Sequence, residues 1–476
     1  MKKINNIKSI LLIVIISTLI PIAIITTYNL CISNTLKKLQ SIINSNIVKL
    51  TIIIFIITYT LIIIEEFIKI KKSAIAIISS GLIWTLISIS TPINNESFSI
   101  NKIIKNNLLM YSELLLFLIV AITYINSLKD RNVFKKIKYL IIIKKLTYKQ
   151  IYFITGIIAF FVSPIADNLT TSLIFCSIII SLGKNNEKFI NLGCINIIIA
   201  ANAGGVFSPF GDITTLMIWQ SNLLKFDSFF KIFLPSMVSF LIPSLIMSFN
   251  VQNENIILTK NKKVKTKVGA IQITILFFFT IIMSMIFQHY LNIPAVIGML
   301  TGLGLLQLYE NLLKKKIPTN KFNLSKQISN IDWDTLIFFY GIMLCIEGIS
   351  ALGLLNDLSS LIYTNLGKNL PPNYQQTPAN ILIGLISSII DNIPIVYAIL
   401  SMKPTMNEGQ WLLVTLTSGI GGSLLSIGSA SGVAVMGQAK GIYTFFSHLK
   451  WSWAILLGYS MGIIVHIYIN KNMFTS

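Results

Sequence analysis

Charged side chains are scarce in this sequence of 476 residues: only 12% are charged, while 54% are hydrophobic. A soluble globular protein carries about twice that share of charge, because polar groups must cover its surface. Apolar runs long enough to cross a bilayer recur from one end of the chain to the other. The lack of charge excludes a soluble domain and predicts an all-α polytopic membrane protein.

Acidic residues are scarcer still, with 17 Asp and Glu against 38 Lys and Arg, and the formal net charge is +21. Such an excess of basic residues can indicate a nucleic-acid partner. Lys and Arg, however, fall in the predicted loops and tails or, at Lys231 and Lys440, near the end of a predicted apolar stretch, and a charge run beside a span is an orientation signal. The predicted partner is therefore the lipid bilayer, with no nucleic acid.

Cysteine and histidine are also few, at four and three residues. Three of the cysteines lie inside apolar runs, and neither residue type shows the spacing of a metal site. No glycine-rich phosphate-binding loop is present, so a pump driven by ATP has no support. The sequence predicts a protein that is not an enzyme and needs no bound cofactor.

Uninterrupted spans are predicted at 9–27, 50–64, 73–93, 108–128, 229–249, 268–289, 293–309, 333–352 and 451–470. Four further apolar stretches are interrupted by polar residues, Gly or Pro, and these are 150–182, 189–224, 376–402 and 410–446. The first segment, with basic residues before a long apolar run, favours a retained helix over a cleaved signal sequence.

The basic residues are concentrated on one side of the membrane if the first and third interrupted stretches are hairpins that enter and leave on the same side. The loops that then face the same way as the N-terminus hold 28 of the 38 basic residues. Basic loops face the cytoplasm. The sequence thus predicts a cytoplasmic N-terminus in the inner membrane of a bacterium.

The same topology predicts two inverted repeats, each with three spans, a re-entrant hairpin, a broken helix and a last span. Paired broken segments in matching places of inverted halves indicate a transport site. The predicted divisions are an N-terminal segment, the first repeat, a basic linker, the second repeat and a tail, at 1–46, 47–249, 250–267, 268–470 and 471–476. A homo-oligomer is compatible with this organisation.

Five carboxylates lie within the apolar stretches, and an ionisable group there indicates function because its burial is costly. They are Glu113, Asp167, Asp212, Glu347 and Asp391. Asp167, Asp212 and Asp391 fall at the breaks, and no Lys or Arg lies in the interior of a predicted span to pair with them. Such carboxylates must be neutral, hold a cation or face water. Alternation between a proton and a metal cation is what an exchanger requires.

We therefore expect Asp167 and Asp391 to exchange a metal cation for H⁺, with Asp212 as a third ligand or a proton carrier. Glu113 and Glu347 are expected to support proton access or packing. Unwound backbone would add carbonyl ligands at the breaks, which are marked by Gly204, Gly205, Pro209, Gly211, Gly421, Gly422 and Gly428. Side-chain ligands are predicted at Asn168, Thr170, Thr171, Asn202, Ser208, Thr214, Asn392, Ser426 and Ser429. The plainer alternatives are an N-cap at Asp167 and simple helix packing by the small residues.

Several segments resemble the NhaD-type sodium/proton antiporters of the ion-transporter superfamily, and the resemblance covers roughly residues 47–470. They are SELLLFLIVAITYIN, SLKDRNVF with ITGIIAFFVSPIADNLTTSLIF, ANAGGVFSPFGDITTLMIWQ, DNIPIVYAIL and SGIGGSLLSIGSASGVAVMG. The resemblance implies that hairpin pairs form the substrate site. Dicarboxylate carriers of that superfamily have Ser-Asn-Thr at the hairpin tips, and Asp stands in the Ser position here. A negative charge at each tip suits a cation and repels a dicarboxylate.

Two other functions remain as alternatives. An organic-anion or arsenite carrier on the same scaffold would need a cationic residue near the site. An intramembrane aspartyl protease would use two membrane aspartates for acid–base work, but it leaves the repeat unexplained. The expected function is Na⁺ or Li⁺ exchange for H⁺.

Overall fold

The computed structural model describes residues 46–65, 70–90, 100–143, 146–183, 186–254, 264–316, 322–439 and 441–475. Over these ranges the chain is helical and forms no β-strand, which confirms the all-α prediction. The predicted span 9–27, its signal-sequence alternative and the middle of the predicted linker lie outside the described residues.

Eight helices in these ranges are long and apolar enough to cross a membrane. They comprise α5 (Lys72–Ser90), α6 (Ile100–Asp130), α8 (Tyr148–Ala166), α13 (Ala270–Tyr290), α14 (Ala295–Lys316), α16 (Trp333–Ala351), α23 (Ser452–Ile469) and α12 (Phe233–Ser248), which follows the 3-10 helix η1 (Asp227–Ile232). The predicted span 50–64 lies in α3 (Asn46–Ile63). One difference concerns α8: it was expected to be half of a hairpin, yet it has the length of a full span.

Apolar side chains on these helices face outward instead of packing in a core. On α13, Ile275, Phe279 and Ile282 are each at least half exposed. Meanwhile many Ser, Thr and Asn side chains are completely buried. Lipid can cover apolar surface but cannot pair with polar groups, so this distribution confirms a multi-pass membrane protein.

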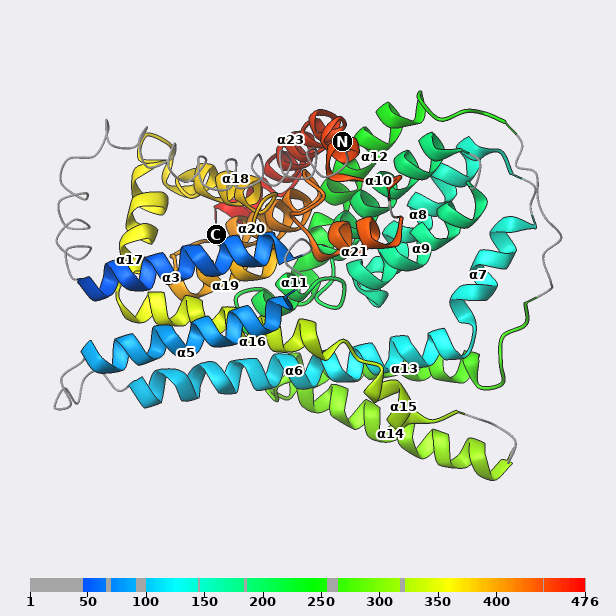
Figure 1. Cartoon of the computed structure of the whole chain (residues 1–476), viewed down its shortest axis with the longest axis horizontal. Helices are drawn as coiled ribbons and strands as arrows, with labels where there is room; N and C mark the ends of the chain where they lie inside the picture. The colour runs from blue at the N-terminus through cyan, green and yellow to red at the C-terminus, as the bar shows by residue number, and fades with distance from the viewer. Residues whose placement is uncertain are drawn as a thin grey trace. The chain divides into compact units, whose positions relative to one another are not determined.

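One compact unit contains the described residues up to 111, together with 332–379 and 397–405. Within it, α5 packs against α3 and α16 (Figure 1). The segment 353–375, between two predicted apolar stretches, is helical over much of its length. It forms α17 (Leu354–Ser359), the π-helix η2 (Ser360–Asn365) and the 3-10 helix η3 (Pro372–Tyr374).

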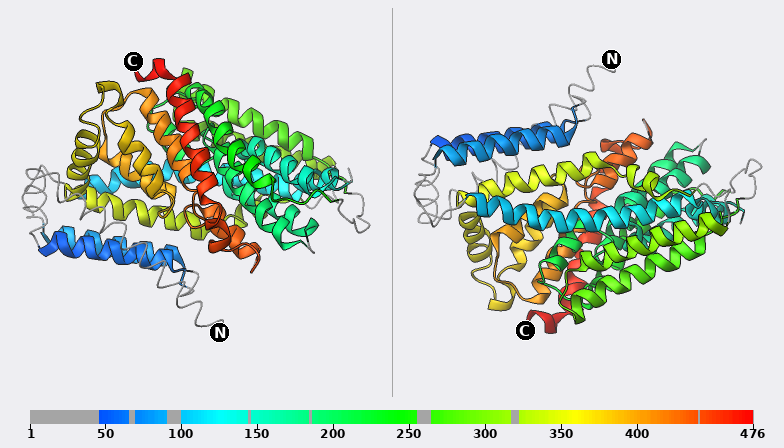
Figure 2. Two further views of the ribbon diagram at one scale, coloured as in Figure 1. Left: turned by 90° about the horizontal axis from the view of Figure 1, so that it is seen from above. Right: turned by 90° about the horizontal axis from the view of Figure 1, so that it is seen from below.

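The second unit contains 112–331, 380–396 and 406–476. Helix α10 (Glu187–Gly205) packs against α8, α9 (Asn168–Leu182) and α12, and α12 lies along α23 (Figure 2). Shorter helices occupy predicted loops, namely α7 (Val133–Ile142), α15 (Leu324–Ser329) and α22 (Phe445–Leu449).

Helix breaks occur in all four interrupted stretches. The first, between α8 and α9, is the single residue Asp167, with φ 54° and ψ 159°. This positive φ is rare outside glycine and strains the backbone. The others separate α10 from α11 (Ile213–Gln220), α18 (Thr377–Ile386) from α19 (Asn392–Met402), and α20 (Glu408–Gly421) from α21 (Ala430–Gln438).

Helices α10 and α20, which end at the second and fourth breaks, each pack closely against the helix that ends at the preceding break, and a glycine makes the contact. A Cβ atom on Gly204 would overlap the backbone of Phe160 in α8, and one on Gly421 would overlap the backbone of Gly384 in α18. Glycine is needed at both positions because no side chain fits. The predicted repeat and its inverted orientation stay predictions.

Candidate functional site

The Asp212 side chain is hydrogen-bonded to two other segments of the second unit, at Asn168 and Asn392. One of its carboxylate oxygens, Oδ2, accepts hydrogen bonds from Asn392 Nδ2 at 2.8 Å and from Asn168 Nδ2 at 3.3 Å. These asparagines begin the helices that follow the two predicted hairpin tips. The Asp212 side chain is 5% exposed. A buried carboxylate thus lies between amides from both tips.

The local backbone holds this carboxylate in place. Asp212 caps α11, because its Oδ1 accepts from the Thr214 backbone N–H at 3.3 Å. The Thr215 hydroxyl donates to the backbone oxygens of Ser208 and Asp212, at 2.9 and 2.6 Å. The residues between α10 and α11 therefore form a compact turn that presents Asp212 at the start of α11.

The first predicted hairpin tip, around Asp167 and Asn168, is hydrogen-bonded to the turn between α10 and α11. The Asn168 backbone N–H donates to the Gly211 carbonyl at 3.1 Å, and the Ser208 hydroxyl donates to the Pro164 carbonyl at 3.0 Å. Carbonyls freed at the breaks are thereby paired within the protein, as membrane depth requires. These hydrogen bonds hold the tip and the turn together.

Asp167 is an N-cap, as the plainer alternative from the sequence predicted. Its Oδ1 accepts from the Thr170 backbone N–H at 2.7 Å, so it caps α9. It also interacts electrostatically with Lys129, the penultimate residue of α6. The prediction that no Lys or Arg of a span pairs with the break carboxylates is wrong for Asp167, because α6 continues two residues beyond the predicted span 108–128 and includes Lys129.

Asp391 directly precedes α19 and is half-buried. It interacts electrostatically with Asp212, and the two like charges repel. The structure therefore groups Asp212 with Asp391, whereas the sequence had suggested Asp167 and Asp391 as the exchanging pair.

A second polar cluster is centred on Asn202 of α10. Its Nδ2 donates to Ser423 Oγ at 2.8 Å and to Ser429 Oγ at 3.2 Å. Its Oδ1 accepts from Ser431 Oγ at 3.1 Å, and the Ser429 and Ser431 hydroxyls are 2.9 Å apart. All four side chains are buried. The cluster joins the first broken helix to the second.

Asp212 and Ser429 hold matching positions, since each caps the helix that follows a break. Each of these two caps also lies beside the broken helix that precedes the other cap. Asn202 reaches Ser429, and Gly419, at the matching place in α20, lies beside Asp212, where an added Cβ would come within 3.9 Å of Oδ2. The helices that follow these two breaks thus begin with one charged cap and one neutral cap.

Three predicted hydroxyl ligands are fully buried, and they are Thr171, Thr214 and Ser426. The Thr171 Oγ1 atom has no hydrogen-bond partner among the described residues, whereas the Thr214 side chain interacts with the Asp212 carboxylate. Thr170 is half-buried at the tip. Unsatisfied buried hydroxyls are costly, and they are oxygen ligands of the kind that a hard cation takes.

The two predicted support residues lie in different surroundings. Glu113 lines a cavity of about 300 Å³ with Gln220, Asn222 and Gln288, at the C-terminal end of α11. Helix α11 has eight residues, which places this cavity roughly 12 Å along the helix from Asp212. Glu347, in the first unit, accepts a hydrogen bond from Tyr397 OH at 3.0 Å, and Tyr397 OH accepts from Asn107 Nδ2 at 2.6 Å.

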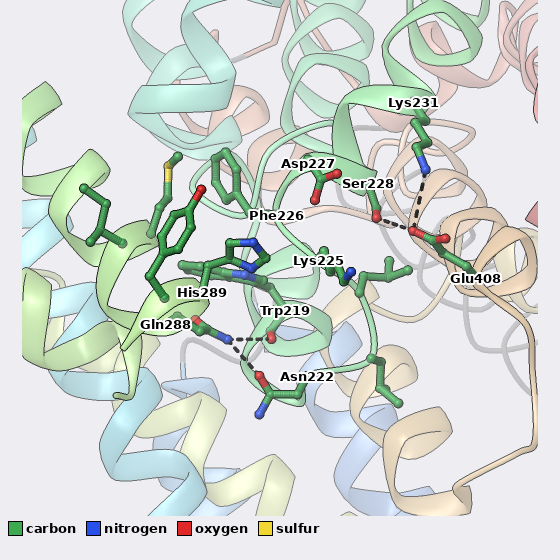
Figure 3. A pocket seen from close by; sticks show the side chains of 15 residues that line it. Trp219, Asn222, Lys225, Phe226, Asp227, Ser228, Lys231, Gln288, His289 and Glu408 are labelled. Carbon is green, nitrogen blue, oxygen red and sulfur yellow. Dashed lines mark hydrogen bonds and ion pairs between the residues drawn. The ribbon is translucent and has the colours of Figure 1, made fainter. Parts of the chain in front are cut away.

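A larger cavity of about 790 Å³ adjoins the same end of α11 (Figure 3). Glu408 accepts from the Ser228 hydroxyl there and pairs with Lys231 at 3.9 Å. Gln288 Nε2 donates to the Trp219 carbonyl and to Asn222 Oδ1, both at 3.1 Å. The cavity is lined by charged residues of both signs.

Sequence reasoning missed Ser423, Tyr443 and His448, which surround the second break. His448 is fully buried and bonds to the Ser423 carbonyl. A lone histidine outside any ligand spacing carries no signal in the sequence. Its partner is a backbone atom 25 residues away, and backbone contacts leave no trace in residue types.

The chain is similar in sequence to known proteins over most of its length. A family model described as "Citrate transporter" matches residues 59–421. The chain is 44% identical over 448 residues to "Na(+)/H(+) antiporter NhaD" of Vibrio cholerae, covering 89% of this chain and 92% of that protein. It is 43% identical over 450 residues to the protein of the same name from Alkalimonas amylolytica, covering 89% and 91%. It is 30% identical over 436 residues to "Sodium/proton antiporter 1" of Arabidopsis thaliana, covering 88% and 72%.

Proposed function

The chain belongs to the family of NhaD Na⁺/H⁺ antiporters, and we propose that it is a secondary transporter that exchanges Na⁺ or Li⁺ for H⁺. The protein is proposed to lie in the inner membrane of a bacterium, with its N-terminus in the cytoplasm. The proposed partners are the bilayer and small inorganic cations, and no cofactor is required.

The observation that carries the proposal is the meeting of both tip asparagines on one buried carboxylate. Amide N–H groups stabilise an ionised Asp212, because hydrogen bonds to a charged group are the stronger kind. Each amide also has a carbonyl oxygen. A hard cation prefers oxygen ligands, so rotation of the two amides would present oxygens to Na⁺ held by Asp212.

A proton and Na⁺ would then compete for the same carboxylate. Asp391 strengthens this competition, since its interaction with Asp212 places two negative charges close together in a buried site. Coupled acidic groups of this kind take up positive charge as a pair. Release of one ion before binding of the other produces exchange without ATP.

The neutral cluster of Asn202, Ser429 and Ser431 supplies further oxygens. Asp167 has a different role in this proposal. It caps α9, is strained and interacts with Lys129, so it fixes the tip that carries Asn168.

An organic-anion carrier is disfavoured although the matching family model is described as a citrate transporter. An organic anion would meet Asp212 and Asp391, whose charges repel it. The aspartyl protease is likewise disfavoured, because the relatives that match nearly the whole chain are named antiporters.

The test is ion flux in liposomes that contain the purified protein and an internal pH dye. A pulse of external NaCl or LiCl should make the interior alkaline, while choline chloride should not. Citrate uptake under the same conditions, with no response to Na⁺, would refute the proposal in favour of the carrier.

A further inference from the structure

The second break depends on a residue that lies outside it. Helix α20 ends at Gly421, and the backbone between it and α21 must find partners for its carbonyls. His448 Nε2 lies 2.8 Å from the Ser423 carbonyl oxygen, and His448 Nδ1 lies 2.8 Å from Tyr443 OH. Both ring nitrogens are therefore used.

The chemistry of these partners determines the state of the ring. A carbonyl oxygen can only accept, so Nε2 must carry the hydrogen. The neutral ring then has a lone pair at Nδ1, which accepts from the Tyr443 hydroxyl. Burial lowers the pKa of His448 to about 4. The histidine thus acts as a fixed donor to the break at neutral pH.

Ser423 connects this donor to the ion site. Its hydroxyl accepts from Asn202 Nδ2 at 2.8 Å, and the same nitrogen donates to Ser429 Oγ. A shift of the Ser423 backbone would therefore move a direct partner of Asn202. Ser429 caps α21 at the position that matches Asp212.

Helix α22, which carries His448, is itself anchored. Thr444 and Ser447 form a capping box at its start. Ser447 Oγ donates to Asn191 Oδ1 at 2.7 Å, and Asn191 lies on α10, eleven residues before Asn202. Helix α22 therefore joins α10 to the second break, and both of these segments contribute to the Asn202 cluster.

We propose that His448 is a positioning residue for ion exchange: by holding the Ser423 carbonyl, it fixes the Asn202–Ser429 cluster and so sets the affinity for Na⁺. The inference rests on the proposed function of that cluster. It predicts a change in the half-saturating Na⁺ concentration, whereas a purely structural role would change only the amount or stability of the protein.

The experiment compares His448→Phe and His448→Gln with the unchanged protein in liposomes. Phe fills the space but cannot donate, so a buried carbonyl loses its partner. We expect the half-saturating Na⁺ concentration to rise about tenfold, with a smaller change in maximal rate. Gln keeps an amide donor near the position of Nε2 and should restore most of the affinity.

His466 offers a matched control. It is fully buried, its Nε2 lies 2.9 Å from the Gly409 carbonyl, and its Nδ1 lies 2.9 Å from Asn470 Nδ2. Gly409 is at the first turn of α20, far along the helix from the break. His466→Phe should lower the melting temperature without raising the half-saturating Na⁺ concentration.

The outcomes separate this inference from the proposed function. An unchanged protein that shows no Na⁺-driven proton flux would refute the proposed function itself. Normal flux with equal Na⁺ affinity in His448→Phe and His466→Phe would overturn the inference alone. Should His448→Phe fail to fold, Tyr443→Phe decides, because loss of the hydroxyl frees the ring to tilt. The half-saturating concentration should then rise severalfold, and no rise would refute the inference.

Discussion

Removal of the Asn392 side chain should weaken Na⁺ binding more than removal of Asn168. The Asn392 amide is 4% exposed and donates to Asp212 at 2.8 Å, whereas Asn168 is half-buried and donates at 3.3 Å. A buried hydrogen bond to a charged group contributes about 1.5–3 kcal/mol, and an ordinary one about 0.5–1.5 kcal/mol. Loss of the donor disfavours the ionised form of Asp212, so the proton competes better with Na⁺ for this carboxylate at fixed pH. At about 1.4 kcal/mol per tenfold, Asn392→Ala should raise the half-saturating Na⁺ concentration by roughly 10- to 100-fold. Asn168→Ala should raise it by roughly 2- to 10-fold.

The assay is Na⁺-dependent proton flux in liposomes, measured over a range of Na⁺ concentrations at fixed pH. Asn380→Ala is the control, because Asn380 is also fully buried and donates at 2.8 Å, but to Gln410 Oε1. The control should lose stability and keep its Na⁺ affinity. Unchanged affinity in Asn392→Ala, or a larger effect in Asn168→Ala, would refute the assignment of Asp212 as the point where both tips meet.

Two further predictions concern topology and the support residues. Lys188 and Lys368 are both exposed, and Cys replacements at these positions should react with an impermeant reagent from opposite sides of the membrane; reaction from the same side would contradict the inverted repeat. Glu113→Gln should lower the maximal rate less than Asp212→Asn, because Glu113 lines a cavity at the far end of α11; complete loss of flux in Glu113→Gln would show that the site extends to that cavity.

The helix breaks could be predicted from the sequence because their causes are local. Gly, Pro and Asp interrupt apolar runs at 163–168, 202–212, 391–394 and 419–432, and each stretch contains a break in the structure. The capping role of Asp167 could also be anticipated, since an aspartate at the start of a helix accepts from the N–H three residues on. These features depend on near neighbours in the chain.

The central position of Asp212 could not be predicted in this way. Asp167, Asp212 and Asp391 look equivalent in the sequence, and what separates them is a hydrogen bond between residues 180 positions apart. The extension of α6 through Lys129 was missed because hydropathy ends a span at the first charge, whereas backbone hydrogen bonding continues. The short helices in 353–375 were missed for a similar reason, as they lie in a stretch whose polar residues and glycines are typical of loops.

The most direct test of the account is proton flux by Asp212→Asn. Asparagine keeps the size and hydrogen bonding of the side chain but cannot titrate or carry charge. The variant should reach the membrane in normal amount and show no Na⁺- or Li⁺-driven proton flux at any pH, while Asp212→Glu retains part of it. Full exchange by Asp212→Asn would contradict the claim that one carboxylate, held between both tip asparagines, takes up the proton and the cation in turn.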